Sequence, residues 1–307
     1  MGSAKADTLI GPNQANQWNI TGANTGAVNV TAFAGFENLT GGTGADTFSI
    51  TNNGTVSGKI DGGKGTTAIN YLIGPDQPNV WALLGSNAGR LNATAFANIQ
   101  NLTGGAQGDA FVFAKRAKVS GRIDGGGGLN RLDYSAYTTS VTVDLSAGTA
   151  TGTAGIAKIQ AVTGGTAADQ LTGNAEDNIL IGGGGNDTLI GNDGRDLLFG
   201  GDGLDTIRGG PGEDLIISGK TTFDANWTVL DALLNYWRGP DGFGVRTDNL
   251  AAGTTGDPAL PKLDSTTITN DNFVDDLMGG ADADWYFAKT TDPKEDLYDL
   301  LADDRVN

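Results

Sequence analysis

A nine-residue period is the feature that most constrains how this chain can fold. Six consecutive nonapeptides run from Gly164 to Ile217, and each begins with glycine. Position six is Asp or Asn and position eight is Leu or Ile in every copy. A pattern repeated at one short spacing predicts stacked coils, each burying its aliphatic side chain against its neighbours. The position-six residues are Asp169, Asn178, Asp187, Asp196, Asp205 and Asp214.

The same period returns after a gap of 52 residues. Asn270–Met278 and Gly279–Phe287 carry Asp275 and Asp284 at position six. We therefore predict that residues 218–269 loop out as an insertion and that the solenoid then continues in register. In that arrangement Asp205 stacks with Asp275, Asp214 stacks with Asp284, and the acidic tail covers the open edge.

The predicted insertion contains the one clear helix signal of the chain. Its apolar residues lie at helical spacing, and Asp224 is the expected N-cap. A Gly/Pro-rich loop is expected from Gly239 to Pro261. The residues of the apolar helix face are Trp227, Leu230, Leu233, Leu234 and Trp237. We expect this face to pack on the solenoid.

A longer repeat organises residues 1–163. Gly11-Pro12 recurs as Gly74-Pro75 and Trp18 recurs as Trp81, each displaced by 63 residues, which is seven nonapeptides. This region is predicted to be a diverged solenoid, with both tryptophans in its core rather than stacked on a sugar. Most of its turns lack a position-six carboxylate, since Thr67 and Asn130 stand where Asp is expected. The exceptions are Asp46 and Asp109.

The nonapeptide spacing suits calcium. Glycine permits positive φ, so positions one to six can form a tight turn, while positions seven to nine form a short strand. Two nonapeptides make one coil, which stacks turn n on turn n+2 about 4.8 Å away. Carbonyls and carboxylates from both turns can then surround one cation, and Ca²⁺ prefers six to eight oxygens.

Composition narrows the function. The chain has no Cys and no His, which removes disulfides, thiolate or imidazole metal sites and His-dependent catalysis. Residues 1–163 carry nine acidic and ten basic side chains, whereas residues 164–307 carry 27 acidic and nine basic. This acidity argues against nucleic acid as a partner and is of the sign that calcium neutralises. No stretch is long and apolar enough to predict a membrane span.

Across 164–217 and 270–287 the chain resembles the RTX (hemolysin-type calcium-binding repeat) family. The resemblance implies a parallel β-roll with several Ca²⁺ ions between stacked turns. It also implies type I secretion read from a C-terminal signal, and folding only in extracellular calcium. Asp284-Trp285-Tyr286-Phe287 is similar to the C-terminal ends of large bacterial surface proteins of this family.

The sequence therefore predicts an all-β fold, a parallel β-roll or β-solenoid with a small helix-containing C-terminal cap. Its parts are a diverged solenoid (1–163), a calcium β-roll (164–217), the insertion (218–269), and resumed turns with the cap and secretion signal (270–307). We interpret it as a monomeric, extracellular calcium-binding module, the stalk and export end of a secreted or surface protein, and not an enzyme. The alternatives are a solenoid face that binds a glycan or cell-surface ligand and, less favoured, a polysaccharide-acting enzyme.

Overall fold

The computed structural model describes residues 6–64, 68–271, 273–288, 296–298 and 300–307. Two compact units are present. Unit 1 runs through Asp133 and includes Gly148–Ile159; unit 2 consists of Tyr134–Ala147 and the residues from Gln160 onward. No helix in the described ranges is long and apolar enough to cross a membrane.

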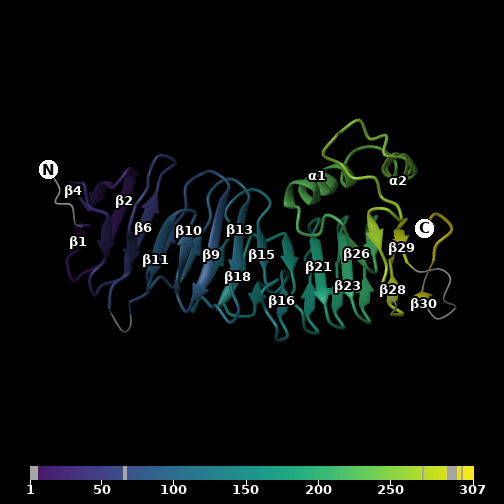
Figure 1. Cartoon of the computed structure of the whole chain (residues 1–307), viewed down its shortest axis with the longest axis horizontal. Helices are drawn as coiled ribbons and strands as arrows, with labels where there is room; N and C mark the ends of the chain where they lie inside the picture. The colour runs from purple at the N-terminus through teal and green to yellow at the C-terminus, as the bar shows by residue number, and fades with distance from the viewer. Residues whose placement is uncertain (1–5, 65–67, 272, 289–295, 299) are drawn as a thin grey trace. The chain divides into compact units, whose positions relative to one another are not determined.

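Unit 1 is built from short strands in two hydrogen-bonded rows (Figure 1). One row has the order β1-β5-β7-β11-β10-β9-β13-β15 and the other β18-β14-β12-β8-β6-β2-β3-β4. Most neighbours pair in parallel, and the antiparallel pairs are β2–β3, β3–β4, β9–β10 and β10–β11. The strands are β1 Thr8–Ile10, β2 Asn16–Gly22, β3 Thr25–Val28, β4 Thr31–Ala34, β5 Asn38–Thr40, β6 Asp46–Ile50, β7 Lys59–Asp61, β8 Tyr71–Ile73, β9 Asn79–Gly85, β10 Ala88–Leu91, β11 Thr94–Ala97, β12 Asn101–Thr103, β13 Asp109–Phe113, β14 Arg122–Asp124, β15 Arg131–Asp133, β17 Thr149–Ala150 and β18 Gly155–Ala157.

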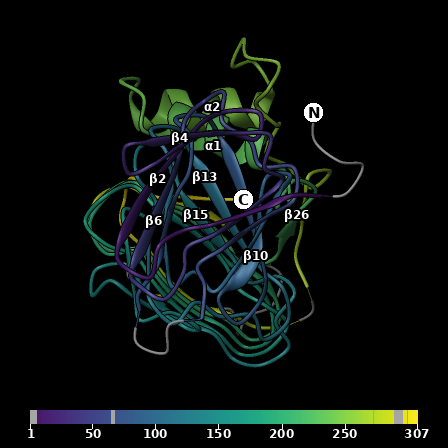
Figure 2. The same cartoon turned by 90° about the vertical axis from the view of Figure 1, so that its left-hand side faces the viewer.

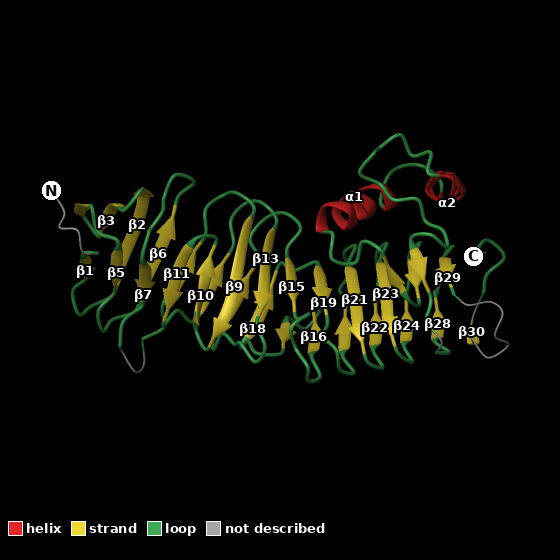
Figure 3. Ribbon diagram, in the orientation of Figure 1, coloured by secondary structure: helices red, strands yellow, loops and turns green. Residues whose placement is uncertain are grey.

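Unit 2 is a parallel β-roll (Figure 3). Strands β26 and β27 form a short antiparallel pair beside it. Its rows are β19-β21-β23-β25-β29-β31 and β16-β20-β22-β24-β28-β30. The predicted parallel solenoid with a small helical part is therefore confirmed. The elements are β16 Thr142–Asp144, β19 Ala161–Thr163, β20 Gln170–Thr172, β21 Ile179–Gly184, β22 Thr188–Ile190, β23 Leu197–Asp202, β24 Thr206–Arg208, β25 Leu215–Ile217, β26 Lys220–Thr221, α1 Trp227–Trp237, α2 Phe243–Ala252, β27 Ile268–Thr269, β28 Asp276–Met278, β29 Trp285–Phe287, β30 Asp296–Tyr298 and β31 Arg305–Val306.

The core of each unit is a stack of inward-facing side chains. In unit 2 position eight points inward, and Leu171, Leu189 and Ile207 are fully buried and adjacent in the stack. In unit 1 both repeated tryptophans are fully buried: Trp18 stacks on Phe48 and Trp81 on Phe111, with ring centroids 5.3 and 5.5 Å apart. The tryptophans are therefore core residues, as predicted, and are not available to a sugar.

The two strand rows of unit 2 differ in what covers their outer face. In the row β20-β22-β24-β28 only the central residue of each strand is buried, whereas the three residues of β25 and of β29 are all buried. The insertion supplies the cover: Phe223 packs edge-on against Phe199, and Trp237 stacks on Trp285. Figure 2 shows α1 and α2 lying outside the stacked coils.

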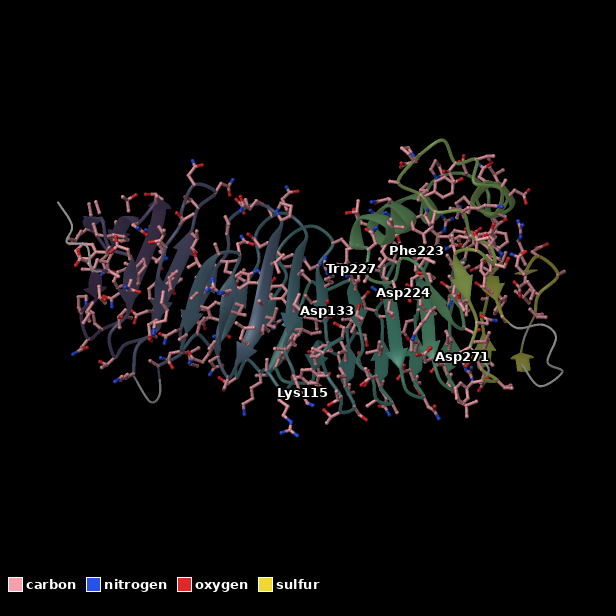
Figure 4. All side chains as sticks on the ribbon, in the orientation of Figure 1. Lys115, Asp133, Phe223, Asp224, Trp227 and Asp271 are labelled. Carbon is pink, nitrogen blue, oxygen red and sulfur yellow. The ribbon has the colours of Figure 1, made fainter. Side chains whose placement is uncertain are left out.

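Helix α1 forms where the sequence predicted it, but Asp224 is not its cap. The N-cap is Asn226, whose side chain accepts a hydrogen bond from the Val229 amide. Asp224 instead accepts hydrogen bonds from the backbone and hydroxyl of Thr221, so it closes the turn that leads into the helix (Figure 4). The face formed by Leu230, Leu233, Leu234 and Trp237 is buried, as expected.

The expected loop from Gly239 to Pro261 is wrong in part, because it contains α2. Glycines bracket this helix: Gly242 is its N-cap and Gly253, with φ +71°, ends it. The helix carries a buried arginine, Arg246, that forms an ion pair with Glu213 and lies over the Trp237 ring at 5.1 Å from its centroid. Tertiary contacts therefore outweigh the weak helix signal of a Gly-rich segment.

Candidate metal centres

The position-six side chains of unit 2 form two hydrogen-bonded ladders. In each rung, Oδ1 of one position-six Asp accepts a hydrogen bond from the backbone N–H of the position-six residue one coil earlier. The N···O distances are 2.7 to 2.8 Å. One ladder links Asp169, Asp187, Asp205 and Asp275, and the other links Asn178, Asp196, Asp214 and Asp284.

Both ladders continue across the insertion. The Asp205 amide donates to Asp275, and the Asp214 amide donates to Asp284, each at 2.8 Å. Strand β28 pairs with β24 and β29 with β25, in parallel. The predicted stacking of residues 270–287 on the preceding coils is thus confirmed by its register.

The insertion interrupts a turn rather than preceding one. The position-one carbonyl of this coil belongs to Ser218 and accepts a hydrogen bond from the Gly201 amide at 3.1 Å, while the stacked carboxylate comes from Asp275. Asp271 reaches the preceding turn of the same row and accepts a hydrogen bond from the Gly203 amide at 2.6 Å (Figure 4). The coil that stacks on Asp205 is therefore assembled from both ends of the insertion.

The second carboxylate oxygen sets a chemical requirement. The Oδ2 atoms of Asp187, Asp196, Asp205 and Asp214 are buried and have no hydrogen-bond partner among the residues that the structure describes. A buried carboxylate oxygen without a donor is costly, and the cost is relieved by a proton or by a cation. These atoms are the clearest sign that the turns are built around something that the chain itself does not supply.

The electrostatics of these carboxylates agree. Burial raises the pKa of Asp187 to about 7 and that of Asp205 to about 8. Burial also raises the pKa of Asp214 to about 10, and the carboxylates of Asp196 and Asp284 add to the rise. Desolvation combined with stacked like charges disfavours the ionised form, which a bound cation would reverse.

The first glycine of each turn makes room for this arrangement. A Cβ added to Gly182 would meet Asp187 Oδ2 and the Gly200 carbonyl oxygen, both at 2.5 Å. Positions two and four need positive φ, as at Gly183 (+102°) and Gly185 (+118°). The glycines thus allow a carboxylate oxygen and a carbonyl oxygen from successive coils to share one small space.

Carbonyl oxygens must supply most of any metal ligands. Among the residues that the structure describes, no group of three or more His, Cys, Asp or Glu side chains is placed to hold a metal ion. Paired carboxylate and carbonyl oxygens at each turn are the donor set of Ca²⁺, and they do not suit metals that prefer nitrogen or sulfur. The residues present therefore fit calcium.

A comparison with known families decides the nature of the repeats. The family model of the RTX calcium-binding nonapeptide repeat (4 copies) matches residues 31–49, 163–198 and 190–220. These nonapeptides are RTX repeats. RTX repeats bind Ca²⁺, and the number of copies implies several ions. No curated protein matches the chain.

Not every nonapeptide turn is equally open. In three turns the position-two N–H folds back onto the position-six side chain: Gly165 donates to Asp169, Asn174 to Asn178 and Gly105 to Asp109. In these closed turns the second oxygen of Asp169 and of Asp109, and the single side-chain oxygen of Asn178, already accept a hydrogen bond. Position two has no positive φ in any of the three. Asp169, Asn178 and Asp109 occupy the predicted positions but do not show the unpartnered oxygen of the open turns.

In the described part of unit 1, the turn at Asp46 is open. Its Oδ2 is buried without a hydrogen-bond partner, and Gly42 at position two has φ +110°. Burial raises the pKa of Asp46. This turn also lies within the first matched segment of the RTX model. Asp46 is thus the predicted residue of unit 1 that most resembles the open turns of unit 2.

The nonapeptide pattern did not identify every residue that accepts a hydrogen bond from a position-six amide. Asp304 accepts a hydrogen bond from the Asp284 amide at 2.8 Å, and β31 pairs with β29, so the tail adds a further coil. Its signal is an Asp followed two residues later by Val306. Thr67 lies outside the described residues, and it is Asn70, three residues later, that accepts a hydrogen bond from the Asp46 amide at 2.9 Å. Asn130 stands in the ladder as predicted, bonded to the Asp109 amide.

Proposed function

We propose that the chain is a calcium-stabilised structural module of a secreted or cell-surface protein. The observation that carries the proposal is the series of buried, unpartnered Oδ2 atoms repeated along the two ladders of unit 2. Ca²⁺ would be held where these oxygens face a position-one carbonyl of the next coil. The residues that would hold it are Asp187 with Gly200, Asp196 with Gly209, Asp205 with Ser218, and Asp214 with Gly279.

Calcium titration of the metal-free chain tests this. We expect heat of binding for about one ion per open turn, and affinities of roughly 10⁻⁴ to 10⁻³ M, as in extracellular calcium modules. Circular dichroism should show a cooperative gain of β signal over the same range. Absence of binding heat, with an unchanged spectrum in chelator, would contradict the proposal.

A matched pair of variants locates the ions. Asp196→Asn removes a buried carboxylate of the ladder, while Asp193→Asn removes the same charge from an exposed position three residues earlier. We expect Asp196→Asn to lower the calcium stoichiometry by one ion and Asp193→Asn to leave it unchanged. Equal loss in both variants would mean that calcium responds to overall acidity and not to the turn.

An extracellular setting is the part of the proposal that the expected affinity supports. A site that fills near millimolar calcium stays empty at the low calcium concentrations inside a cell, so unit 2 would fold after export. Residues 270–307 would then serve as both the last coils and the export end. Coexpression with a type I exporter tests this: the full chain should reach the medium, and a chain ending at Ala288 should stay in the cell.

We expect no catalytic activity. The chain lacks His and Cys, and the buried carboxylates of unit 2 are held in the ladders by backbone donors. A base that must collect protons from a substrate would need an accessible position. The same groups are well placed for a structural ion, which needs burial and fixed geometry.

A further inference from the structure

Several turns of unit 1 carry asparagine at position six, and its amide nitrogen stands where the open turns have a carboxylate oxygen. A Cβ added to Gly11 would meet the Gly41 carbonyl oxygen at 2.7 Å and Asn16 Nδ2 at 3.3 Å. The corresponding neighbours of Gly182 are a position-one carbonyl oxygen and Asp187 Oδ2. The backbone setting is the same in both turns, while the atom that faces it changes from an acceptor to a donor.

Oxygens converge on the amide nitrogen of Asn16. Nδ2 lies 3.0 Å from the Pro12 carbonyl oxygen, 2.8 Å from that of Gln14 and 3.1 Å from that of Gly41. Asp46 Oδ1 is the fourth oxygen, at 2.6 Å. An amide has only two hydrogens to donate, so four oxygens form a richer cage than the amide needs. The carbonyls come from positions two and four of its own turn and position one of the next coil.

The same contacts recur one 63-residue repeat later. Asn79 Nδ2 donates to the carbonyls of Pro75 at 3.0 Å and Gln77 at 2.7 Å, again positions two and four. Asn130 Nδ2 donates to the position-four carbonyl of its own turn, that of Gly128, at 3.2 Å. It also donates to the carbonyl of Lys158 at 3.0 Å. The arrangement is therefore a property of the turn and not of one residue.

A second asparagine fixes the orientation of each amide in the repeated pair. Asn29 Nδ2 donates to Asn16 Oδ1 at 3.1 Å, and Asn92 Nδ2 donates to Asn79 Oδ1 at 2.9 Å. Asn29 and Asn92 both adopt left-handed backbone, with φ +53° and +52°. Because Oδ1 is held by a donor, Nδ2 must face the carbonyls.

We propose that the amides of Asn16, Asn79 and Asn130 are built-in substitutes for calcium, and that Asn16 occupies a latent cation site. The inference rests on the proposed binding of Ca²⁺ in the open turns of unit 2. Each amide N–H group donates to the turn carbonyls, as a cation would otherwise attract them, so these turns are complete without metal. Changing the amide to a carboxylate places a further oxygen in the cage, and the five oxygens then need a cation.

The test is Asn16→Asp in the full chain, with calcium stoichiometry and hydrogen exchange of β2 and β6 as readouts. We expect one more bound ion than in the unchanged chain. In chelator, the amides of β2 and β6 should exchange at least tenfold faster than in the unchanged chain, and calcium should restore their protection. Gln17→Glu is the matched control, because the same amide-to-carboxylate change falls on the adjacent exposed side chain.

Asn16→Ala separates a lost amide from a gained site. It should speed exchange in β2 and β6 with calcium and without it, since no oxygen is added to bind an ion. The inference is overturned if Asn16→Asp gains no ion, if it behaves like Gln17→Glu, or if calcium rescues it no better than Asn16→Ala. A failure of the proposed function looks different, because the unchanged chain would then bind no calcium in unit 2.

Discussion

Units 1 and 2 build the same kind of coil but satisfy its turns by different means. In unit 1 the amides of Asn16 and Asn79 donate to the turn carbonyls. In unit 2 most of the corresponding side chains are Asp, and the Oδ2 atoms of Asp205 and Asp214 are buried without a donor among the described residues. The comparison teaches that an amide nitrogen at position six completes a turn without an ion, whereas a carboxylate oxygen that no turn N–H reaches leaves the turn dependent on one.

The largest expected effect is that of metal removal. In excess chelator at neutral pH, unit 2 should lose its structure because its stacked carboxylates repel one another, while unit 1 keeps its protection. Hydrogen exchange resolved by peptide should show fast exchange in β21–β25 and slow exchange in β2, β9 and β13. Equal loss in both units would show that unit 1 also depends on calcium.

Acid should substitute in part for calcium in unit 2. Burial raises the pKa of the position-six carboxyls from an unfolded value of 3.8 to about 6 for Asp275 and about 8 for Asp196. A raised pKa in the fold contributes stability below the unfolded value, and this stability is lost as pH rises through the folded values. In chelator, β structure should therefore increase as pH falls from about 8 to about 4. A spectrum that loses β structure on acidification would contradict this.

The effect of Asp214→Asn on the free energy of unfolding should change sign between calcium and chelator. With calcium present the variant loses an ion and should be less stable by about 2 kcal/mol, the linkage expected for a site well above its dissociation constant. In chelator at pH 8 the variant should be more stable than the unchanged chain, because folding of the unchanged chain requires Asp214, with its pKa raised to about 10, to take up a proton, and the neutral amide does not. Thermal unfolding in the two conditions measures both effects. Destabilisation of equal size in both would remove Asp214 from the calcium sites.

The effect of Asp109→Asn on stability should have the same sign with calcium and with chelator. Both oxygens of Asp109 already accept backbone hydrogen bonds, from Gly105 and Asn79 at 2.7 and 2.9 Å. An amide can accept only one of them, so the variant should lose about 1 kcal/mol. The loss should be the same with calcium and with chelator. A loss that appears only in chelator-free buffer would place an ion at this turn.

The smallest effect is expected at a surface pair of unit 1. Lys158 lies 3.2 Å from Asp124, and both side chains are partly exposed. Lys158→Ala should cost less than about 1 kcal/mol, independent of calcium and reduced by salt. A calcium-dependent loss would show that Asp124 also belongs to a metal turn.

The repeat spacing was enough to predict the coil, the stacking order and most ladder positions, because position six and position eight face the same way in every turn. It was enough to pair Asp205 with Asp275 across 70 residues. It could not separate open from closed turns, since Asp169 and Asp187 differ in the backbone angles of their neighbours rather than in the side chain. Helix α2 was missed because its stability comes from Arg246 and its contacts with Glu213 and Trp237.

A polar residue outside the period could carry the same role without being recognised. Asn70 lies three residues beyond the expected place, and Asp304 lies 20 residues after Asp284 instead of 18. Both are found only when hydrogen bonds are traced from one coil to the next. A looser search, for Asp or Asn two residues before an aliphatic side chain, would have found them.

The break in the turn after Ser218 is a site at which the solenoid can accept an inserted domain. Strands β26 and β27 pair Lys220 with Thr269, which brings the two ends of the insertion together before it departs. Because the entropy of closing a loop grows only slowly with its length, a domain with adjacent termini could replace the helices at small cost. The replacement domain would have to bury the apolar outer face formed by side chains such as Phe199 and Trp285. Such an exchange would leave the position-six ladders and their calcium sites intact while the inserted domain changes.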